Sequence, residues 1–143
     1  MKEINSEIEI FSTPEHVWRI LTDFGRYPQW NPFINQINGE LKLGSKLTVH
    51  VKPEGSRGTT FNPTVTKVES NKEMRWIGHF IIKGLMDGEH IFTIKSIGND
   101  RIKFINKEIF TGLLSPIVSL RIKNAIHSFE AMNRSLKERA EKE

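Results

Sequence analysis

The stretch PIVSLRIKNAIHSFEAMNRSLKERAE, residues 116–141, decides the fold of this chain. Its apolar residues recur at steps of three and four, the spacing that places side chains on one face of a helix. Ser115 stands where a helix N-cap belongs, and Pro116 stands at the first helical position, where its missing N–H has no cost. At 1.5 Å per residue the predicted helix is about 35 to 40 Å long, so it crosses a small domain. Other elements must cover its apolar stripe.

Length and composition narrow the classes of protein. A chain of 143 residues can bury about two thirds of its unfolded surface in one core, and we expect a single domain over residues 1–143. The absence of cysteine excludes disulfides and thiolate metal sites and fits a reducing compartment. No apolar run has the length of a signal peptide or a membrane span, so we expect a cytoplasmic protein without membrane insertion. The formal charge of +4 comes from Lys and Arg interleaved with acids, which favours a solvated mixed-charge surface over nucleic-acid binding.

The rest of the chain predicts strands around two short helices. Residues 4–11 alternate as a strand does, Ser12-Thr13-Pro14-Glu15 begins a short helix, and a second, very short helix or turn is expected within 26–32. Six further strands are bounded by turn residues: 33–38, 46–53, 59–69, 73–82, 87–97 and 101–110. Short connections join antiparallel neighbours. We therefore predict an α+β fold, with a curved, seven-stranded antiparallel sheet wrapped around the long C-terminal helix and two short helices after the first strand.

Several short motifs, in this order of elements, resemble a known superfamily. They are Val17-Trp18, Tyr27 with Trp30-Asn31-Pro32-Phe33, Arg75-Trp76, Gly88-Glu89-His90 with Phe92, and Glu108 with Phe110 and Gly112-Leu113-Leu114. Together they resemble the SRPBCC (START-like) superfamily, and within it the small bacterial polyketide cyclase/dehydrase-like proteins. The resemblance implies a helix-grip fold, in which the sheet and the C-terminal helix enclose an apolar cavity. Members of the superfamily are lipid and hormone carriers, cyclases, aromatases and chaperone cofactors, so the fold does not settle function.

The alternation of side chains along strands predicts a polar pair on the inner face of the sheet. Trp76, Phe92 and Phe104 fall on inward faces of their strands. If Gly98-Asn99-Asp100 is a three-residue hairpin loop, Ile97 faces Arg101. Counting back in register then places Phe92 opposite Asn106 and His90 opposite Glu108. Two ionisable side chains would meet on an apolar wall.

This pair has three interpretations. His90 and Glu108 can recognise a carbonyl or hydroxyl of a bound ligand, or act as a general acid/base couple. Alternatively, they satisfy each other, or a buried water, and only stabilise strand pairing.

Apolar residues between glycines predict a gate at one end of the sheet. In an antiparallel meander the segments 53–58, 83–87 and 111–115 lie at the same end. Leu85, Met86 and Leu113 are expected there as a mobile gate over an apolar mouth. The alternative is that these residues, with Leu114, pack on the start of the long helix. Trp30 and Phe33 either line the cavity or wedge the short helices against the long one.

Other catalytic signatures are missing from the sequence. There is no Gly-x-Ser-x-Gly elbow, phosphate loop, dinucleotide fingerprint or His-Glu-x-x-His motif. The remaining histidines are too dispersed to form a metal set, so we expect no metal and no cofactor. Asn133-Arg134-Ser135 has the form of a glycosylation acceptor but falls within the predicted helix.

Two main functions remain open. The first is a carrier or sensor that binds a small hydrophobic molecule, lipid-, polyketide- or aromatic-like, in an internal cavity. The second is a cofactor-free cyclase or dehydratase with His90 and Glu108 as its acid/base pair; a protein-interaction domain is a weaker third. We expect a monomer or weak homodimer. The predicted ligand-binding residues are Phe33, Trp76, Phe80, His90, Phe92, Asn106, Glu108, Phe110, Leu114, Val118, Ile122 and Ala125.

Overall fold

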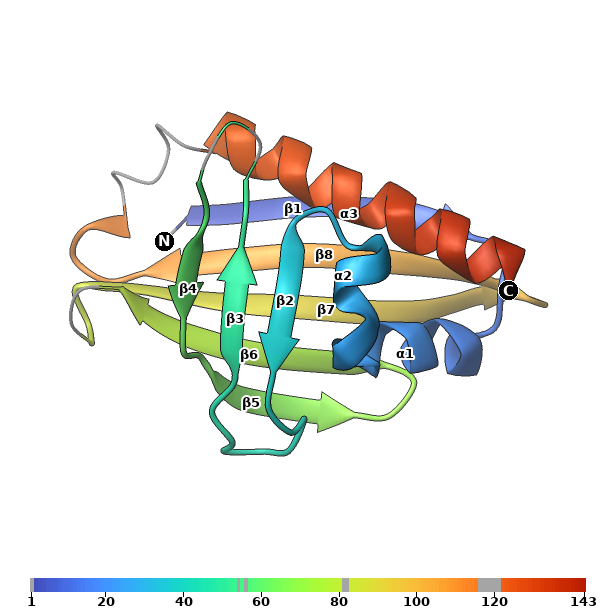
Figure 1. The fold of residues 1–143 in the computed structure, drawn as a ribbon, viewed down its shortest axis with the longest axis horizontal. Coiled ribbons are helices and arrows are strands. Elements are labelled where there is room, and N and C mark those ends of the chain that lie inside the picture. The colour runs from blue at the N-terminus through green and yellow to red at the C-terminus, as the bar shows by residue number, and fades with distance from the viewer. Residues whose placement is uncertain (1, 54, 56, 81–82, 116–121) are drawn as a thin grey trace.

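The structure is a computed structural model that describes residues 2–53, 55, 57–80, 83–115 and 122–143, with the side chains of 80 and 122–124 left out (Figure 1). Eight strands and three α-helices follow one another along the described chain. The strands are β1 (Lys2–Ile10), β2 (Ile34–Asn38), β3 (Thr48–Val51), β4 (Thr59–Phe61), β5 (Thr64–Glu69), β6 (Glu73–Phe80), β7 (Met86–Gly98) and β8 (Arg101–Thr111). The helices are α1 (Pro14–Thr22), the 3-10 turn η1 (Phe24–Arg26), α2 (Tyr27–Trp30) and α3 (Ile122–Lys142).

The strands form two antiparallel sheets. The larger has the order β1-β8-β7-β6-β5, and the smaller has the order β2-β3-β4. In Figure 1 the strands of the smaller sheet run across those of the larger one. A bridge between Lys46 and Thr64 joins the two. The predicted antiparallel sheet and C-terminal helix are confirmed, but the sheet is divided where one continuous meander was expected.

The division falls inside the predicted strand 59–69. Pro63 has no N–H to offer a ladder, so β4 ends at Phe61 and β5 begins at Thr64 on the other sheet. The Asn62 side chain donates to the carbonyl oxygen of Leu47 at 3.3 Å and to Thr48 Oγ1 at 3.0 Å, which holds the corner in place. One predicted strand therefore becomes two, and the count rises from seven to eight.

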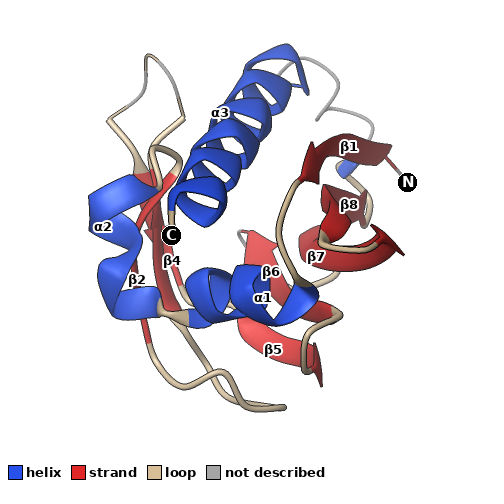
Figure 2. Ribbon diagram, turned by 90° about the vertical axis from the view of Figure 1, so that its right-hand side faces the viewer, coloured by secondary structure: helices blue, strands red, loops and turns tan. Residues whose placement is uncertain are grey.

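Helix α3 lies between the two sheets. Figure 2 shows β1 and β8 on one side of it and β2 and β4 on the other. Phe129, Met132, Leu136 and Ala140 form its buried stripe, at the predicted helical spacing. The predicted first turn of this helix, at Pro116, lies outside the described residues. The stripe closes a core whose largest members on the sheet side are Trp76, Phe92 and Phe104.

The short helices fill the end of the core beside α3. Thr13 accepts a hydrogen bond from the backbone N–H of His16 at 3.1 Å and caps α1, with Pro14 in its first turn as predicted. Helix α1 ends at Thr22, and the chain then tightens into the 3-10 turn η1, which contains Gly25. Trp30 stacks edge-on against Tyr27 at 5.0 Å, so it wedges α2 against the core.

Candidate functional site

The register of the β7–β8 hairpin brings the predicted pair together. His90 pairs with Glu108, and Phe92 pairs with Asn106, as predicted. The loop itself differs from the prediction, because Gly98 rather than Ile97 pairs with Arg101 and the register shifts between Ser96 and Gly98. Ile97 is therefore an extra residue in a bulge, which restores the predicted register for the rest of the hairpin.

His90 is buried among aromatic rings. Its imidazole stacks on Phe92 with ring centroids 4.2 Å apart and planes 14° from parallel. Phe129 of α3 lies 5.0 Å away on another side, and Trp76 of β6 lies 6.0 Å away. These rings hold the imidazole in one orientation, with its two nitrogens at the edge of an apolar enclosure.

A chain of side-chain hydrogen bonds begins at one imidazole nitrogen. His90 Nε2 lies 2.6 Å from Asn106 Oδ1, and Asn106 Nδ2 donates to Asn133 Oδ1 at 3.1 Å. Asn133 Nδ2 then donates to Ser6 Oγ at 2.8 Å. The chain joins β7, β8, α3 and β1, so the helix and the sheet together determine how His90 is held.

The direction of this chain decides where His90 carries its proton. Asn106 gives its N–H groups to Asn133 and, at 3.6 Å, to the sulfur of Met132, so its oxygen faces the imidazole. That oxygen can only accept, and His90 Nε2 therefore carries the hydrogen while Nδ1 keeps a lone pair. Burial lowers the pKa of His90 to about 4, and the Asn106 bond only partly opposes this. The imidazole is neutral at pH 7.

Glu108 stands beside that lone pair without bonding to it. Its Oε1 lies 4.0 Å from His90 Nδ1, longer than a hydrogen bond, and its side chain is 16% exposed. Burial raises the pKa of Glu108 to about 7, so the carboxyl is largely protonated below neutral pH. The two side chains are close enough for an electrostatic interaction but make no direct hydrogen bond, and the three interpretations of the pair stay predictions.

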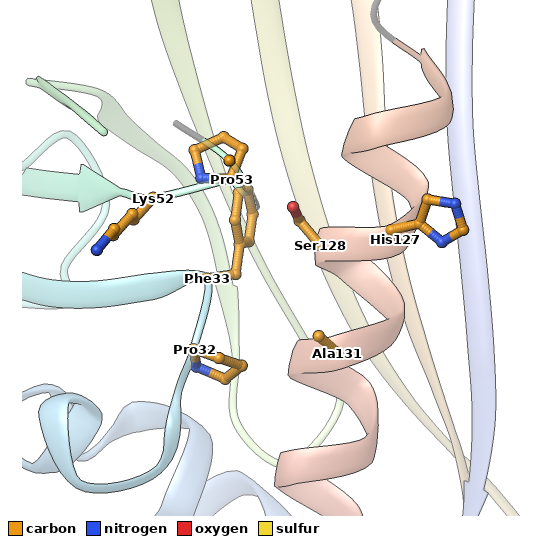
Figure 3. Close-up of a pocket in the computed structure, with 8 residues that line it drawn as sticks. Pro32, Phe33, Lys52, Pro53, His127, Ser128 and Ala131 are labelled. Carbon is orange, nitrogen blue, oxygen red and sulfur yellow. The ribbon is translucent and has the colours of Figure 1, made fainter. Parts of the chain in front are cut away.

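A pocket of about 330 Å³ opens between α3 and the ends of β2 and β3. Phe33 and Pro53 form one wall of it, and Ser128 and Ala131 form the other, as Figure 3 shows. The Lys52 side chain points away from α3 in this view. The Phe33 ring contacts Phe129 at 5.4 Å, and Phe129 in turn contacts His90. Two aromatic rings therefore lie between this pocket and the polar pair.

Comparison with known proteins assigns the family. The family model described as polyketide cyclase / dehydrase and lipid transport matches residues 1–141. The chain belongs to this family. This match confirms the predicted SRPBCC resemblance at the level of family and fold. A search of curated proteins finds no match.

Solved structures similar to this polyketide cyclase/dehydrase and lipid transport family member share its whole fold. A START superfamily protein from Mycobacterium smegmatis is 22% identical, with a TM-score of 0.77 over 98% of this chain and 97% of that one. The ZhuI aromatase/cyclase from a Streptomyces species is 13% identical, with a TM-score of 0.77 over 99% and 94%. A norcoclaurine synthase point mutant from Thalictrum flavum, in complex with a transition-state analogue, is 12% identical, with a TM-score of 0.74 over 99% and 94%. At these identities the likeness shows the fold.

The structure places the predicted ligand-binding residues of this family member in several different settings. Trp76, Phe92 and Asn106 are buried around His90, while Phe110 and Ala125 are partly buried against the core. Leu114 is also partly buried, and among the predicted residues whose side chains the structure describes, only Phe33 lines the pocket of Figure 3. Val118 and the side chains of Phe80 and Ile122 lie outside the described residues. Ligand contact by these residues stays a prediction.

Two of the three loops predicted to cluster are joined by backbone hydrogen bonds. The Leu114 N–H donates to Leu85 O at 2.9 Å, and the Leu113 N–H donates to Gly84 O at 3.4 Å. Gly112 permits this approach because its φ is +103° and a Cβ there would stand 2.7 Å from Leu85 O. Leu113 is 83% exposed, whereas Leu85 and Met86 are partly buried. A gating movement of these residues stays a prediction.

Sequence reasoning missed the helix side of the site. Asn133, considered only as a glycosylation acceptor, lies 2% exposed in the hydrogen-bond chain. The available signal was an amide between Met132 and Leu136 on the apolar stripe, since a buried amide requires partners. Phe129 was predicted only as part of the helix stripe, and Ser6 only as part of a strand.

Two classes of site find no support within the described ranges. No three His, Asp or Glu side chains there lie close enough to hold a metal ion. None of the helices in that part of the chain combines the length and the apolar composition needed to cross a bilayer.

Proposed function

We propose that this protein binds a small hydrophobic molecule with one polar group between its sheets and α3, as a carrier or sensor. The observation that carries the proposal is the pair of polar atoms, His90 Nδ1 and Glu108 Oε1, 4.0 Å apart beside an aromatic wall. Within the described part of the protein no hydrogen bond is made to either atom, and neither is wholly shut off from solvent, so both are free to pair with a polar group of a ligand. A ligand that is apolar along its body and polar at one end would match the aromatic wall and pair with these two atoms.

The pocket beside α3 supports a route to this pair. Its walls are mainly apolar, and Phe33, which lines it, contacts Phe129, which in turn contacts His90. Movement of the Phe33 and Phe129 rings would open the pocket toward His90. The family description, which includes lipid transport, agrees with a ligand of this kind.

Ligand retention tests the proposal. The protein is purified without denaturation and examined by native mass spectrometry, and any bound molecule is extracted and identified. Wild type is compared with Glu108→Leu, which removes the polar end of the site, and with Glu3→Leu, a matched change at an exposed position of β1. A bound apolar molecule in wild type and Glu3→Leu, reduced in Glu108→Leu, supports the proposal. If wild type is empty and apolar probes do not bind, the proposal fails.

Proton transfer is a second candidate function, favoured by the titration of Glu108. A carboxyl with a pKa near 7 beside an imidazole lone pair suits general acid/base chemistry. In a dehydration, His90 Nδ1 would take a proton from the carbon next to a carbonyl, and Glu108 would give its proton to the departing hydroxyl, which leaves as water. Glu108→Gln keeps a hydrogen-bond donor but cannot transfer a proton. Turnover lost with binding retained would support the enzyme, and binding without any turnover in wild type would support the carrier.

A further inference from the structure

We infer that the polar group of the ligand is a single uncharged hydroxyl, which donates to His90 Nδ1 and accepts from Glu108. This inference rests on the proposed binding function and narrows its ligand to an alcohol, enol or phenol on an apolar body. It follows from the direction of the hydrogen-bond chain and from the spacing of its last two members.

The direction of the chain is set at Met132. A thioether sulfur accepts hydrogen bonds but has no hydrogen to donate, so the atom of Asn106 that faces it at 3.6 Å is the nitrogen. The Asn106 oxygen must then face His90, where Nε2 lies 2.6 Å away and donates. The other imidazole nitrogen, Nδ1, is left as an acceptor. A ligand group that pairs with Nδ1 must therefore be a hydrogen-bond donor.

The distance between His90 Nδ1 and Glu108 Oε1 indicates that a single ligand atom bridges them. Hydrogen bonds of about 2.8 Å from each side can meet at one oxygen, because 4.0 Å is shorter than twice that length. The acid form of Glu108 can donate its O–H, so an atom that accepts this hydrogen and gives its own to Nδ1 pairs both groups. A hydroxyl does both, whereas an ether or ketone oxygen has no hydrogen for Nδ1. A carboxylate would place a charge against the aromatic wall of Phe92 and Phe129, at a high desolvation cost.

Three probes of nearly the same shape test this inference: naphthol, its methyl ether and naphthalene. Their affinities are measured by calorimetry at about pH 6, where Glu108 is largely an acid. We expect naphthol to bind roughly tenfold more tightly than the ether, because the ether has no hydrogen to donate to Nδ1. If the ether and naphthalene bind as tightly as naphthol, the hydroxyl inference is wrong while the hydrophobic site stands. If none of the three binds and the purified protein carries no apolar molecule, the proposed function itself fails.

The tautomer gives an independent readout. A long-range proton–nitrogen NMR spectrum identifies which imidazole nitrogen is protonated, and we expect Nε2–H with unprotonated Nδ1 in wild type at about pH 6. Asn106→Asp places a carboxylate at Nε2, which favours the doubly protonated ring and a hydrogen on Nδ1. The preference for naphthol over its ether should then fall toward one, while Asn38→Asp, an exposed control on β2, keeps it. If Asn106→Asp does not fold, a wild-type spectrum with Nδ1–H still overturns the inference.

Discussion

Asn133 on α3 donates a hydrogen bond of 2.8 Å to Ser6 on β1, joining residues 127 positions apart in the chain. The same amide accepts from Asn106 of β8, so one side chain ties the helix to two neighbouring strands. Because Asn133 is 2% exposed, bulk water does not compete for these hydrogen bonds. The helix is therefore held on the sheet by a specific polar contact as well as by its apolar stripe.

Asn133→Ala is expected to lower the free energy of unfolding by about 2 to 3 kcal/mol, because it leaves the buried Asn106 amide without its acceptor. Urea denaturation measures the change. Arg134→Ala, at the next and exposed position of the same helix, is the control and should change stability by no more than about 0.5 kcal/mol. Equal effects of the two substitutions would contradict a stabilising role for the buried amide.

Glu108→Gln should change how stability depends on pH. Burial raises the pKa of Glu108 from 4.5 to about 7, so the folded protein holds a proton that the unfolded chain releases between these values. The free energy of unfolding of wild type therefore falls as pH rises through this window, relative to the variant, which does not titrate there. We expect the variant to gain about 3 kcal/mol over wild type between about pH 4 and pH 8.

Urea denaturation at a series of pH values measures this difference. Burial lowers the pKa of His90, which gives a slope of opposite sign, because stability is lost as pH falls from its unfolded value toward about 4. Both wild type and Glu108→Gln contain His90, so the contribution of His90 that the two proteins share cancels when their free energies of unfolding are subtracted. A difference that stays constant with pH would show that Glu108 has an ordinary pKa.

Phe33→Leu should speed the arrival of naphthol. A smaller side chain loosens the contact with Phe129, which lies between the pocket and His90. Stopped-flow fluorescence is expected to show an association rate several times that of wild type, with stability lowered by about 1 kcal/mol. Phe11→Leu makes the same change at a residue that is 58% exposed and should leave the rate unchanged. An unchanged rate in Phe33→Leu would place the route elsewhere.

Gly112→Ala should separate residues 84–85, which precede β7, from residues 113–114, which follow β8. The new Cβ would stand 2.7 Å from Leu85 O, and the φ of +103° is unfavourable for alanine, so we expect a loss of about 1 to 3 kcal/mol. Hydrogen exchange of the Leu114 amide, which donates to Leu85, measures the local effect. Gly25→Ala is the control, because no atom lies within 4 Å of its added Cβ and its φ is not positive. Unchanged protection of Leu114 in Gly112→Ala would contradict this close approach.

The sequence by itself determined the features that depend on short-range periodicity. The alternation along β7 and β8, with the turn residues between them, was enough to place His90 opposite Glu108. The observed turn has two residues between Gly98 and Arg101, one fewer than the predicted loop, and the extra residue Ile97 in the bulge offsets this difference, so the pairs beyond it keep the predicted register. The stripe on α3 was likewise visible as a helical repeat.

Only the tertiary structure decided which side chains of different elements meet. The contact of Asn133 with Asn106 and Ser6 depends on where along the sheet α3 is placed and on its rotation, and no local pattern reports either. The Phe33–Phe129 contact depends on the smaller sheet, which separates from the larger at Pro63. Proline marks a break in a strand, but the direction of the chain after the break is chosen by the packing of the core. Hydrogen bonds across elements are therefore consequences of packing, whereas the pairing within a hairpin follows from the alternation of its own residues.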